Sequence, residues 1–345
     1  PFKWSILKIK PDEIIEKDYG CGDPSRYVQD GDTVLDLGSG SGKICYMAAQ
    51  LAGENGRVIG VDMNEDMLAL ARKYTDEMAA KLGGHRVRFL KGRIQDLALD
   101  VEAMDAWLAG NPVHSHADLQ ALEAWIAEQR NERPLIADDS VDLVISNCVL
   151  NLVDDAQKAS LVNEIFRVVK PGGRIAISDI VSDEVIPEHL KQDPELWSGC
   201  ISGAFQEQEM LRLFREAGFG CLAFDKWVSE PWRIVEGIEF RSVTLTAVKP
   251  AGTECIDRGH ALIYRGPYAY VSDDEGQEFP RGERMAVCER TFRFYTEGPC
   301  REDFIGIMPA VEKEPVNLCS PSNSRRAPSE TKGGAHTGTT PQSCC

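Results

Sequence analysis

A glycine loop that directly follows a short apolar segment constrains the fold of this chain most strongly. Residues 33–37 (TVLDL) predict a buried strand, and Gly38, Gly40 and Gly42 follow it at once. A helical pattern begins at Ile44. Backbone N–H groups at such a strand–loop–helix junction can face a polar ligand, and the missing side chains let that ligand approach closely. The sequence therefore predicts an α/β domain with a cofactor site at the end of its first strand.

Strands and helices alternate along the chain after this loop. Further strands are predicted at Arg57–Val61, Val87–Leu90, Val141–Ser146, Arg174–Ser178 and Val243–Val248. Helices are predicted at Ile44–Leu51, at Asn64–Leu82 with Asn64 as its N-cap, and at Gln157–Val169 and Glu207–Ala217. Because this alternation joins neighbouring strands in parallel, we expect a Rossmann-like, doubly wound, mostly parallel sheet. We assign this domain to residues 1–250.

The segment between the third and fourth strands is unusually long. Residues 98–134 contain helix-like patterns at 101–108 and 118–129. Ordinary connections are far shorter, so we interpret this segment as a helical insertion.

The chain changes character after about residue 250. Residues 251–312 contain short alternating runs, Thr291–Tyr295 among them, with turn residues between them. This pattern predicts a small β-rich accessory domain. Residues 313–345 are rich in Ser, Pro, Gly and Thr, contain cysteines, and are expected to be largely disordered.

Composition excludes several classes of partner. The formal net charge of −17 argues against nucleic acid and anionic membranes, because both attract basic surfaces. No apolar run reaches the ~18–20 residues of a membrane span. The spacing of the 11 cysteines does not match a zinc site. Because no secretory signal is recognisable in the sequence, we expect these cysteines to be reduced thiols in the cytoplasm.

The glycine loop has three possible interpretations. A dinucleotide fingerprint would need the spacing G-x-G-x-x-G, whereas the third glycine is Gly42 and Lys43 follows. A phosphate-binding P-loop fails because Leu37 and Ile44 stand where Gly and Ser or Thr are required. The spacing G-x-G-x-G resembles the S-adenosylmethionine loop of Rossmann-like methyltransferases. Asp62, at the end of the second strand, would then bind the ribose hydroxyls.

Three cysteines stand in segments that should return to this cofactor site. Cys21 lies in YGCG just before the first strand, and Cys148 lies in SNCVLNL at the end of the fourth. Cys200 lies in WSGCISGA after the fifth. Together with DLGSGSGKICY at 36–46 and GVDM at 60–63, these segments resemble the arsenite S-adenosylmethionine methyltransferases over roughly residues 15–250. The accessory region resembles C-terminal extensions in bacterial members of that family.

The resemblance implies roles for particular residues. Cys21, Cys148 and Cys200 would bind trivalent arsenic, a soft centre that favours a pyramid of three sulfur ligands. The arsenic lone pair would then attack the methyl group of S-adenosylmethionine, which requires positioning rather than a general base. Arsenite or its thiol conjugates would be the substrate, and thioredoxin or glutathione the reductant. The cofactor site would be lined by Tyr19, Gly38, Gly40, Gly42, Asp62, Met63, Ile94 and Asn147.

The chain departs from the family in one place. Related enzymes often carry a further cysteine upstream of YGCG that forms a redox disulfide, but no cysteine precedes Cys21 here. Either the given sequence begins after such a cysteine or another thiol takes its place. Cys45 is the nearest alternative partner, although it can equally be packed in a helix. Cys344 and Cys345 could capture arsenite or could be incidental.

Rival functions remain open from sequence. One is a methyltransferase for a small organic acceptor such as a quinone or sterol, which would be indifferent to the cysteines. Another is a thiol-rich metalloid-binding protein without catalysis. A third is a transferase for another thiophilic acceptor such as antimonite.

Overall fold

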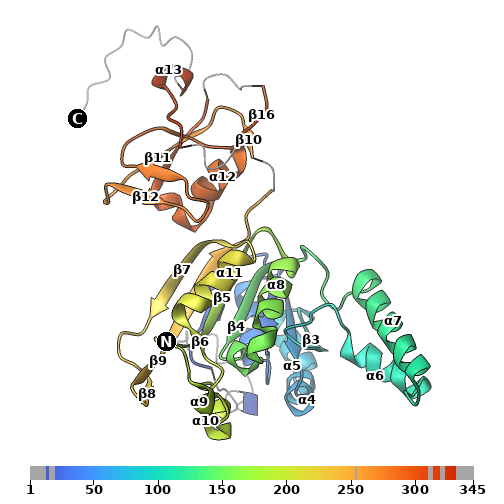
Figure 1. Cartoon of the computed structure of the whole chain (residues 1–345). Helices are drawn as coiled ribbons and strands as arrows, with labels where there is room; N and C mark the ends of the chain where they lie inside the picture. The colour runs from blue at the N-terminus through green and yellow to red at the C-terminus, as the bar shows by residue number, and fades with distance from the viewer. Residues whose placement is uncertain (1–12, 15–19, 253–254, 310–313, 319–322, 332–345) are drawn as a thin grey trace. The chain divides into compact units, whose positions relative to one another are not determined.

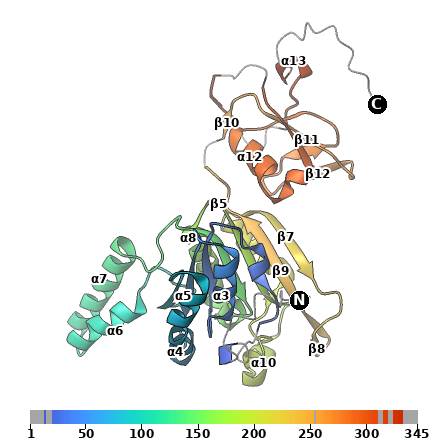
Figure 2. The same cartoon turned by 180° about the vertical axis from the view of Figure 1, so that it is seen from behind.

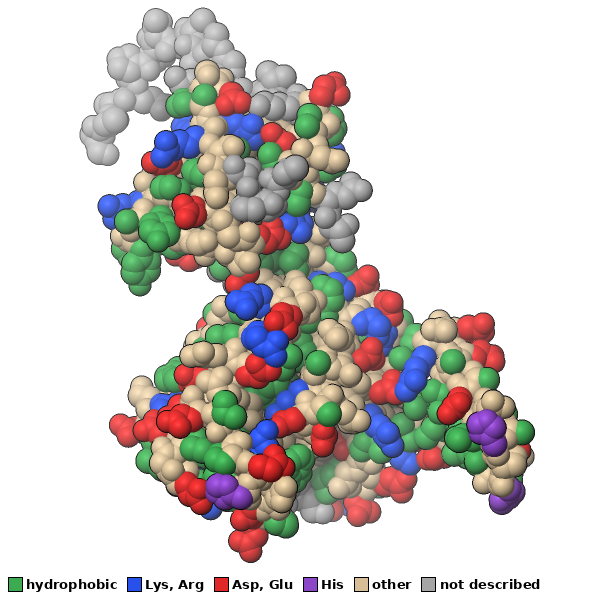
Figure 3. Space-filling view, in the orientation of Figure 1, with side chains coloured by type: hydrophobic (Ala, Val, Ile, Leu, Met, Phe, Trp, Pro, Cys, Tyr) green, Lys and Arg blue, Asp and Glu red, His purple; other side chains and the backbone are tan. Residues whose placement is uncertain are grey.

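A computed structural model of the protein describes residues 13–14, 20–252, 255–309, 314–318 and 323–331. The chain divides into two units, Pro1–Lys249 and Pro250–Cys345. None of the described helices combines the length and the apolar character that crossing a bilayer requires. In Figure 3, acidic and basic side chains are interspersed over the visible face of the first unit.

The first unit is built on a nine-stranded sheet (Figure 1). Its strand order is β3-β2-β1-β4-β5-β9-β7, with β6 paired to β5 and β8 to β9. The first five strands of that order run parallel, and β9 is antiparallel to both β5 and β7. The predicted Rossmann-like fold is therefore confirmed. The strands are β1 (Thr33–Leu37), β2 (Arg57–Asp62), β3 (Val87–Lys91), β4 (Val141–Asn147), β5 (Val169–Ser182), β6 (Phe205–Gln206), β7 (Gly220–Trp227), β8 (Arg233–Val235) and β9 (Ile238–Val248).

Helices cover both faces of this sheet (Figures 1 and 2). One face carries α3 (Lys43–Leu51), α4 (Glu65–Lys73) and α5 (Thr75–Leu82), and the other carries α8 (Lys158–Val168) and α11 (Glu207–Glu216). Successive side chains of a strand point to opposite faces. Val34 accordingly packs in the apolar cluster beneath α3, whereas its neighbour Leu35 packs in the cluster beneath α8.

Several predicted element boundaries differ from the structure, such as that of β9, which begins at Ile238 rather than Val243, and two differences have a clear local cause. The helix expected over Asn64–Leu82 is divided at Tyr74, whose ψ of 5° ends α4, and α5 begins at the next residue. Asn64 is the predicted N-cap, and its side chain accepts a hydrogen bond from the Met67 N–H. The fifth strand is longer than expected because β5 begins at Val169, directly after α8, and a register shift against β4 accommodates Pro171 and its two glycines.

The helical insertion forms α6 (Val101–Gly110) and α7 (His116–Glu132). The two helices lie side by side at the β3 edge of the unit (Figures 1 and 2). The rings of Trp107 and Trp125 stack between them with centroids 5.7 Å apart. Arg130 ties α7 to the sheet side through an ion pair with Asp96 at 2.7 Å. The remaining short helices of the first unit are η1 (Pro24–Tyr27), η2 (Leu150–Leu152), η3 (Asp155–Gln157), α9 (Glu188–Lys191) and α10 (Pro194–Ser198).

The second unit is rich in short strands. β11 (Ala261–Tyr264) pairs with β14 (Met285–Ala286) and β15 (Phe304–Ile307), while β12 (Tyr270–Ser272) pairs with β13 (Glu278–Pro280). β10 (Ile256–Asp257) pairs with β16 (Val316–Asn317). The apolar core of the second unit includes Leu262, Phe279 and Phe304. The unit also contains α12 (Glu289–Glu297), η4 (Pro299–Glu302) and α13 (Pro328–Thr331).

One expectation for this unit was wrong. Thr291–Tyr295 lies inside α12, because Cys288 caps a helix whose apolar side chains Phe292 and Tyr295 face the core. Part of the C-terminal stretch expected to be disordered is ordered, since β16 pairs with β10 and α13 follows. Cys319, Cys344 and Cys345 lie outside the described residues.

Candidate functional site

A cavity of about 830 Å³ opens at the C-terminal ends of the parallel strands. This edge is where ligands bind in open α/β sheets. Six residues predicted for the cofactor site line the cavity, namely Gly38, Gly40, Asp62, Met63, Ile94 and Asn147. Gly42 does not line it, and Tyr19 lies outside the described residues. No residue of α6 or α7 lines it either.

The glycine loop forms a cradle at one wall of this cavity. Gly38, Gly40 and Gly42 have φ values of 69°, 50° and 82°, a region that side chains disfavour. Asp62 holds the loop, because its carboxylate accepts a hydrogen bond from the Gly40 N–H at 2.8 Å. The buried Ser39 hydroxyl lines the cavity and has no hydrogen-bond partner among the described residues. A loop with an unsatisfied buried hydroxyl suits a polar ligand such as S-adenosylmethionine.

A buried pair of side chains lies behind the loop. The Cys45 thiol donates to the Asp36 carboxylate at 3.2 Å. Burial raises the pKa of Asp36 to about 7, and the charge of Asp62 adds to this effect. Cys45 is fully buried, and burial, with Asp36, raises the pKa of its thiol well above the usual value. Cys45 is therefore a packed helix residue rather than the redox partner that the sequence left open for Cys21.

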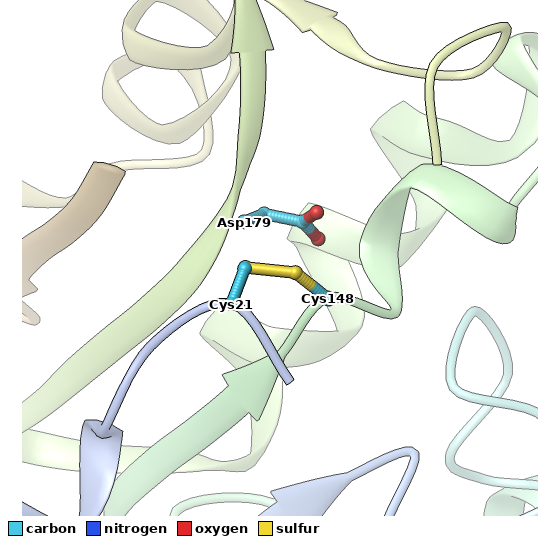
Figure 4. Close-up of side chains that lie close together, drawn as sticks. All are labelled: Cys21, Cys148 and Asp179. Carbon is cyan, nitrogen blue, oxygen red and sulfur yellow. A yellow bond between two sulfur atoms is a disulfide. The ribbon is translucent and has the colours of Figure 1, made fainter. Parts of the chain in front are cut away.

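Cys21 is bonded to Cys148 in a disulfide (Figure 4). The structure thus supplies a partner for Cys21 that the sequence analysis did not identify. The glycines on either side of Cys21 allow this close approach, because a Cβ atom on Gly20 would lie 1.9 Å from the Asn147 amide nitrogen. Asn147 also holds the segment, since its amide accepts from the Gly22 N–H at 3.0 Å and donates to the Gly22 carbonyl at 3.1 Å.

Cys200 approaches the same place from the loop after α10. Its thiol donates to the Cys148 carbonyl at 3.6 Å. Asn151 links this loop to β5, because its amide donates hydrogen bonds to the carbonyl of Cys200 in the loop and to that of Ile180 in the strand. Cys148 and Cys200 have φ values of 60° and 59°. A left-handed backbone conformation is unfavourable for residues other than glycine and tends to occur at functional sites. Here two such residues lie beside each other in space.

Asp179 is a residue of this site that the sequence analysis missed. It lies on β5 with its carboxylate above the disulfide (Figure 4). Its carboxylate oxygen and the Sγ atoms of Cys21 and Cys148 all lie within 4.8 Å of one another. Burial raises the pKa of Asp179 to about 7, although the N–H groups of Leu150 and Ile180 donate to it. A single charged residue within the mainly apolar run Ile175–Ser182 was the available signal.

The surroundings of the sulfur atoms are largely apolar. Cys21, Cys148 and Cys200 belong to a cluster that includes Ile180 and Phe240. Burial, followed by the charge of Asp179, raises the pKa of the Cys200 thiol to about 11. Cys148 lines the cofactor cavity, and Trp197 of α10, which the sequence analysis did not assign, lines it as well. The arrangement places three soft sulfur atoms beside a cavity with a polar cradle.

Comparisons with known proteins agree with this geometry. A family described as a methyltransferase domain matches residues 28–133 and 126–218, and a domain of unknown function matches residues 251–336. The chain is 35% identical over 301 residues to the arsenite methyltransferase of Aquipseudomonas alcaligenes, covering 84% of this chain and 76% of that protein. It is 30% identical to the arsenite methyltransferase of Homo sapiens, covering 89% of this chain and 75% of that protein.

A comparison with solved structures agrees with these sequence matches. The crystal structure of CrArsM, an arsenic(III) S-adenosylmethionine methyltransferase from Chlamydomonas reinhardtii, is similar with a TM-score of 0.58 and 30% identity. The match covers 91% of this chain and 98% of that chain.

Proposed function

Because the chain belongs to the arsenite methyltransferase family, we propose that it methylates trivalent arsenic held by Cys21, Cys148 and Cys200, with S-adenosylmethionine as the methyl donor. One observation carries this proposal at the level of residues. Three cysteines that are distant in sequence converge at one edge of the sheet, and Cys148 also lines the cofactor cavity. A methyltransferase for an organic acceptor would have no use for this convergence.

The cofactor would lie against the glycine loop. Loop N–H groups and the Ser39 hydroxyl would bind its polar groups, and Asp62 would accept from its ribose hydroxyls. Met63 and Ile94 would provide apolar contacts, while Asn147 and Tyr19 would face the same ligand. When bound, S-adenosylmethionine supplies a methyl group on a positively charged sulfur.

The disulfide must be reduced before arsenic can bind. A dithiol or two thiols, such as thioredoxin or glutathione, would provide the two electrons, and Cys21 and Cys148 would each take up a proton. Arsenite would then react with three thiols, each of which transfers its proton to a leaving hydroxyl group, so that three molecules of water are released. Reduced thiols of this kind persist in the cytoplasm.

The apolar cluster around the cysteines supports this chemistry. A complex of trivalent arsenic with three thiolates carries no net charge, so its burial avoids the cost of burying an ion. The cluster of Ile180, Phe240 and their neighbours also keeps water away from the sulfur ligands. The buried carboxyl of Asp179, which lies against two of the sulfurs, is largely neutral below its pKa of about 7 and so does not repel the thiolates there.

A labelled-methyl assay tests the proposal. Reduced protein is incubated with arsenite and methyl-labelled S-adenosylmethionine, and the arsenic species are then separated. We expect methylated arsenic from the native chain and none from Cys148→Ser, with cofactor binding by calorimetry retained. Cys221→Ser, on β7, is the matched control, and should remain active. Full activity of Cys148→Ser would refute the proposed site.

A further inference from the structure

The second unit contains another pair of cysteines that the proposed reaction does not use. Cys255 immediately precedes β10, and Cys288 is the N-cap residue of α12. α12 packs against β10 (Figure 1), and the side chains of Cys255 and Cys288 interact through a hydrogen bond. Burial raises the pKa of the Cys255 thiol, and the neighbouring Cys288 thiol raises it further.

Cys288 is held in place at the start of α12. Its Sγ atom accepts a hydrogen bond from the Thr291 N–H at 3.4 Å and lies 3.1 Å from the Thr291 hydroxyl. As the N-cap residue, Cys288 places this sulfur at the N-terminus of α12. The Arg290 guanidinium interacts electrostatically with both Cys255 and Cys288. A cation and a helix terminus thus face the same pair of thiols.

A cavity of about 420 Å³ adjoins the pair, although neither cysteine itself lines it and Cys288 is buried. Its lining includes Ile256, next to Cys255, and Glu289 and Arg290, next to Cys288. Cys255 itself is only partly buried. In the described part of the chain, no third cysteine, histidine or carboxylate joins these two in a metal-binding cluster. Two sulfur ligands alone do not suit zinc, which takes four ligands in structural sites.

We propose that Cys255 and Cys288 form a second binding site for trivalent arsenic, located in the accessory unit. Arsenite reacts with the two thiols to form two arsenic–sulfur bonds. Each thiol gives its proton to a departing hydroxyl group, two molecules of water leave, and the third hydroxyl stays on arsenic. No oxidation state changes, so no reductant is consumed. The site binds arsenite whether or not the first unit transfers methyl groups, and it gives the accessory unit a role in holding the substrate.

The test uses the full chain without its other candidate arsenic ligands. In this background Cys21, Cys148, Cys200, Cys319, Cys344 and Cys345 are replaced by Ser. The reduced protein is mixed with arsenite, separated by anaerobic gel filtration, and analysed for arsenic by mass spectrometry. We expect one arsenic atom per chain. Adding Cys255→Ser and Cys288→Ser should abolish binding, and Cys255→Ser alone should weaken it about 100-fold or more, because chelation is lost.

Two controls keep the result interpretable. A serine at position 288 can still cap α12, since its hydroxyl accepts from the Thr291 N–H, so the variant should fold. Cys300→Ser, in the same unit, should leave arsenic binding unchanged. Absence of arsenic from the background variant would overturn the proposal, as would its retention after both substitutions. Because this variant lacks the three cysteines of the first unit, the result does not depend on the proposed methylation.

Discussion

Replacement of Gly20 by Ala probes how the Cys21 segment is held. The new Cβ atom would lie 1.9 Å from the amide nitrogen of Asn147, so one of the two groups must move. Asn147 would then lose its two hydrogen bonds to Gly22. Each hydrogen bond contributes about 0.5–1.5 kcal/mol, so the loss of both destabilises the native position of the Cys21 segment by about 1–3 kcal/mol.

The two hydrogen bonds hold Cys21 next to Cys148, so we expect their loss mainly to displace one of the three sulfur ligands. At about 1.4 kcal/mol per factor of ten, we expect kcat/KM for arsenite methylation to fall between about fivefold and 150-fold. Steady-state methylation at saturating cofactor measures this effect. Calorimetry measures separately the part of the loss that comes from weaker binding of S-adenosylmethionine, because Gly20 and Asn147 also line the cofactor cavity.

Gly199→Ala is a closely matched control. Gly199 also directly precedes a site cysteine, but its new Cβ would make ordinary contacts of 3.4 and 3.5 Å with the Glu195 and Leu196 carbonyl oxygens. Its φ of −85° is accessible to alanine. We expect this variant to keep activity within about twofold. If Gly20→Ala is as active as the native chain, or if Gly199→Ala loses as much, the packing argument is wrong.

Three further substitutions test other parts of the account. Asp62→Ala should weaken S-adenosylmethionine binding about tenfold or more, because it removes both the proposed ribose acceptor and the bond to the Gly40 N–H, and unchanged affinity by calorimetry would contradict this role. Asn151→Ala leaves the Cys200 and Ile180 carbonyls without their donor, so we expect the free energy of unfolding to fall by about 2–4 kcal/mol in chemical denaturation, together with methylation activity. For Asp36, a folded-state pKa of about 7 against an ordinary 3.8 means that the unfolded chain ionises first as pH rises, so this residue makes the protein less stable between about pH 4 and 7. As pH rises across that range, the free energy of unfolding of Asp36→Asn should therefore increase relative to that of the native chain by about 4 kcal/mol, at about 1.4 kcal/mol per pH unit. A difference between the two proteins that does not change with pH would refute the assignment.

The sequence predicted those features that depend on local patterns. Alternating apolar strands and helices determine the Rossmann-like sheet, and the glycine spacing marks the cofactor loop. Each of these signals lies within a few neighbouring residues. Asn64 is an example, because its capping role follows from its own side chain and the helix after it.

Features that depend on distant contacts were not predictable in the same way. The pairing of Cys21 with Cys148 spans 127 residues and requires the β4 edge to be in place. Asp179 directly follows the predicted strand Arg174–Ser178, and only the placement of β5 brings it beside both cysteines. The helix at α12 was missed because its cap is a cysteine, which is an uncommon capping residue.

The central claim is that Cys21, Cys148 and Cys200 together hold trivalent arsenic beside the cofactor cavity. Anomalous diffraction from crystals of the reduced protein with arsenite tests it most directly, because it locates arsenic independently of activity. We predict an anomalous peak bonded to the Sγ atoms of all three cysteines. Arsenic bound elsewhere in the chain, with these three sulfurs unoccupied, would contradict the account.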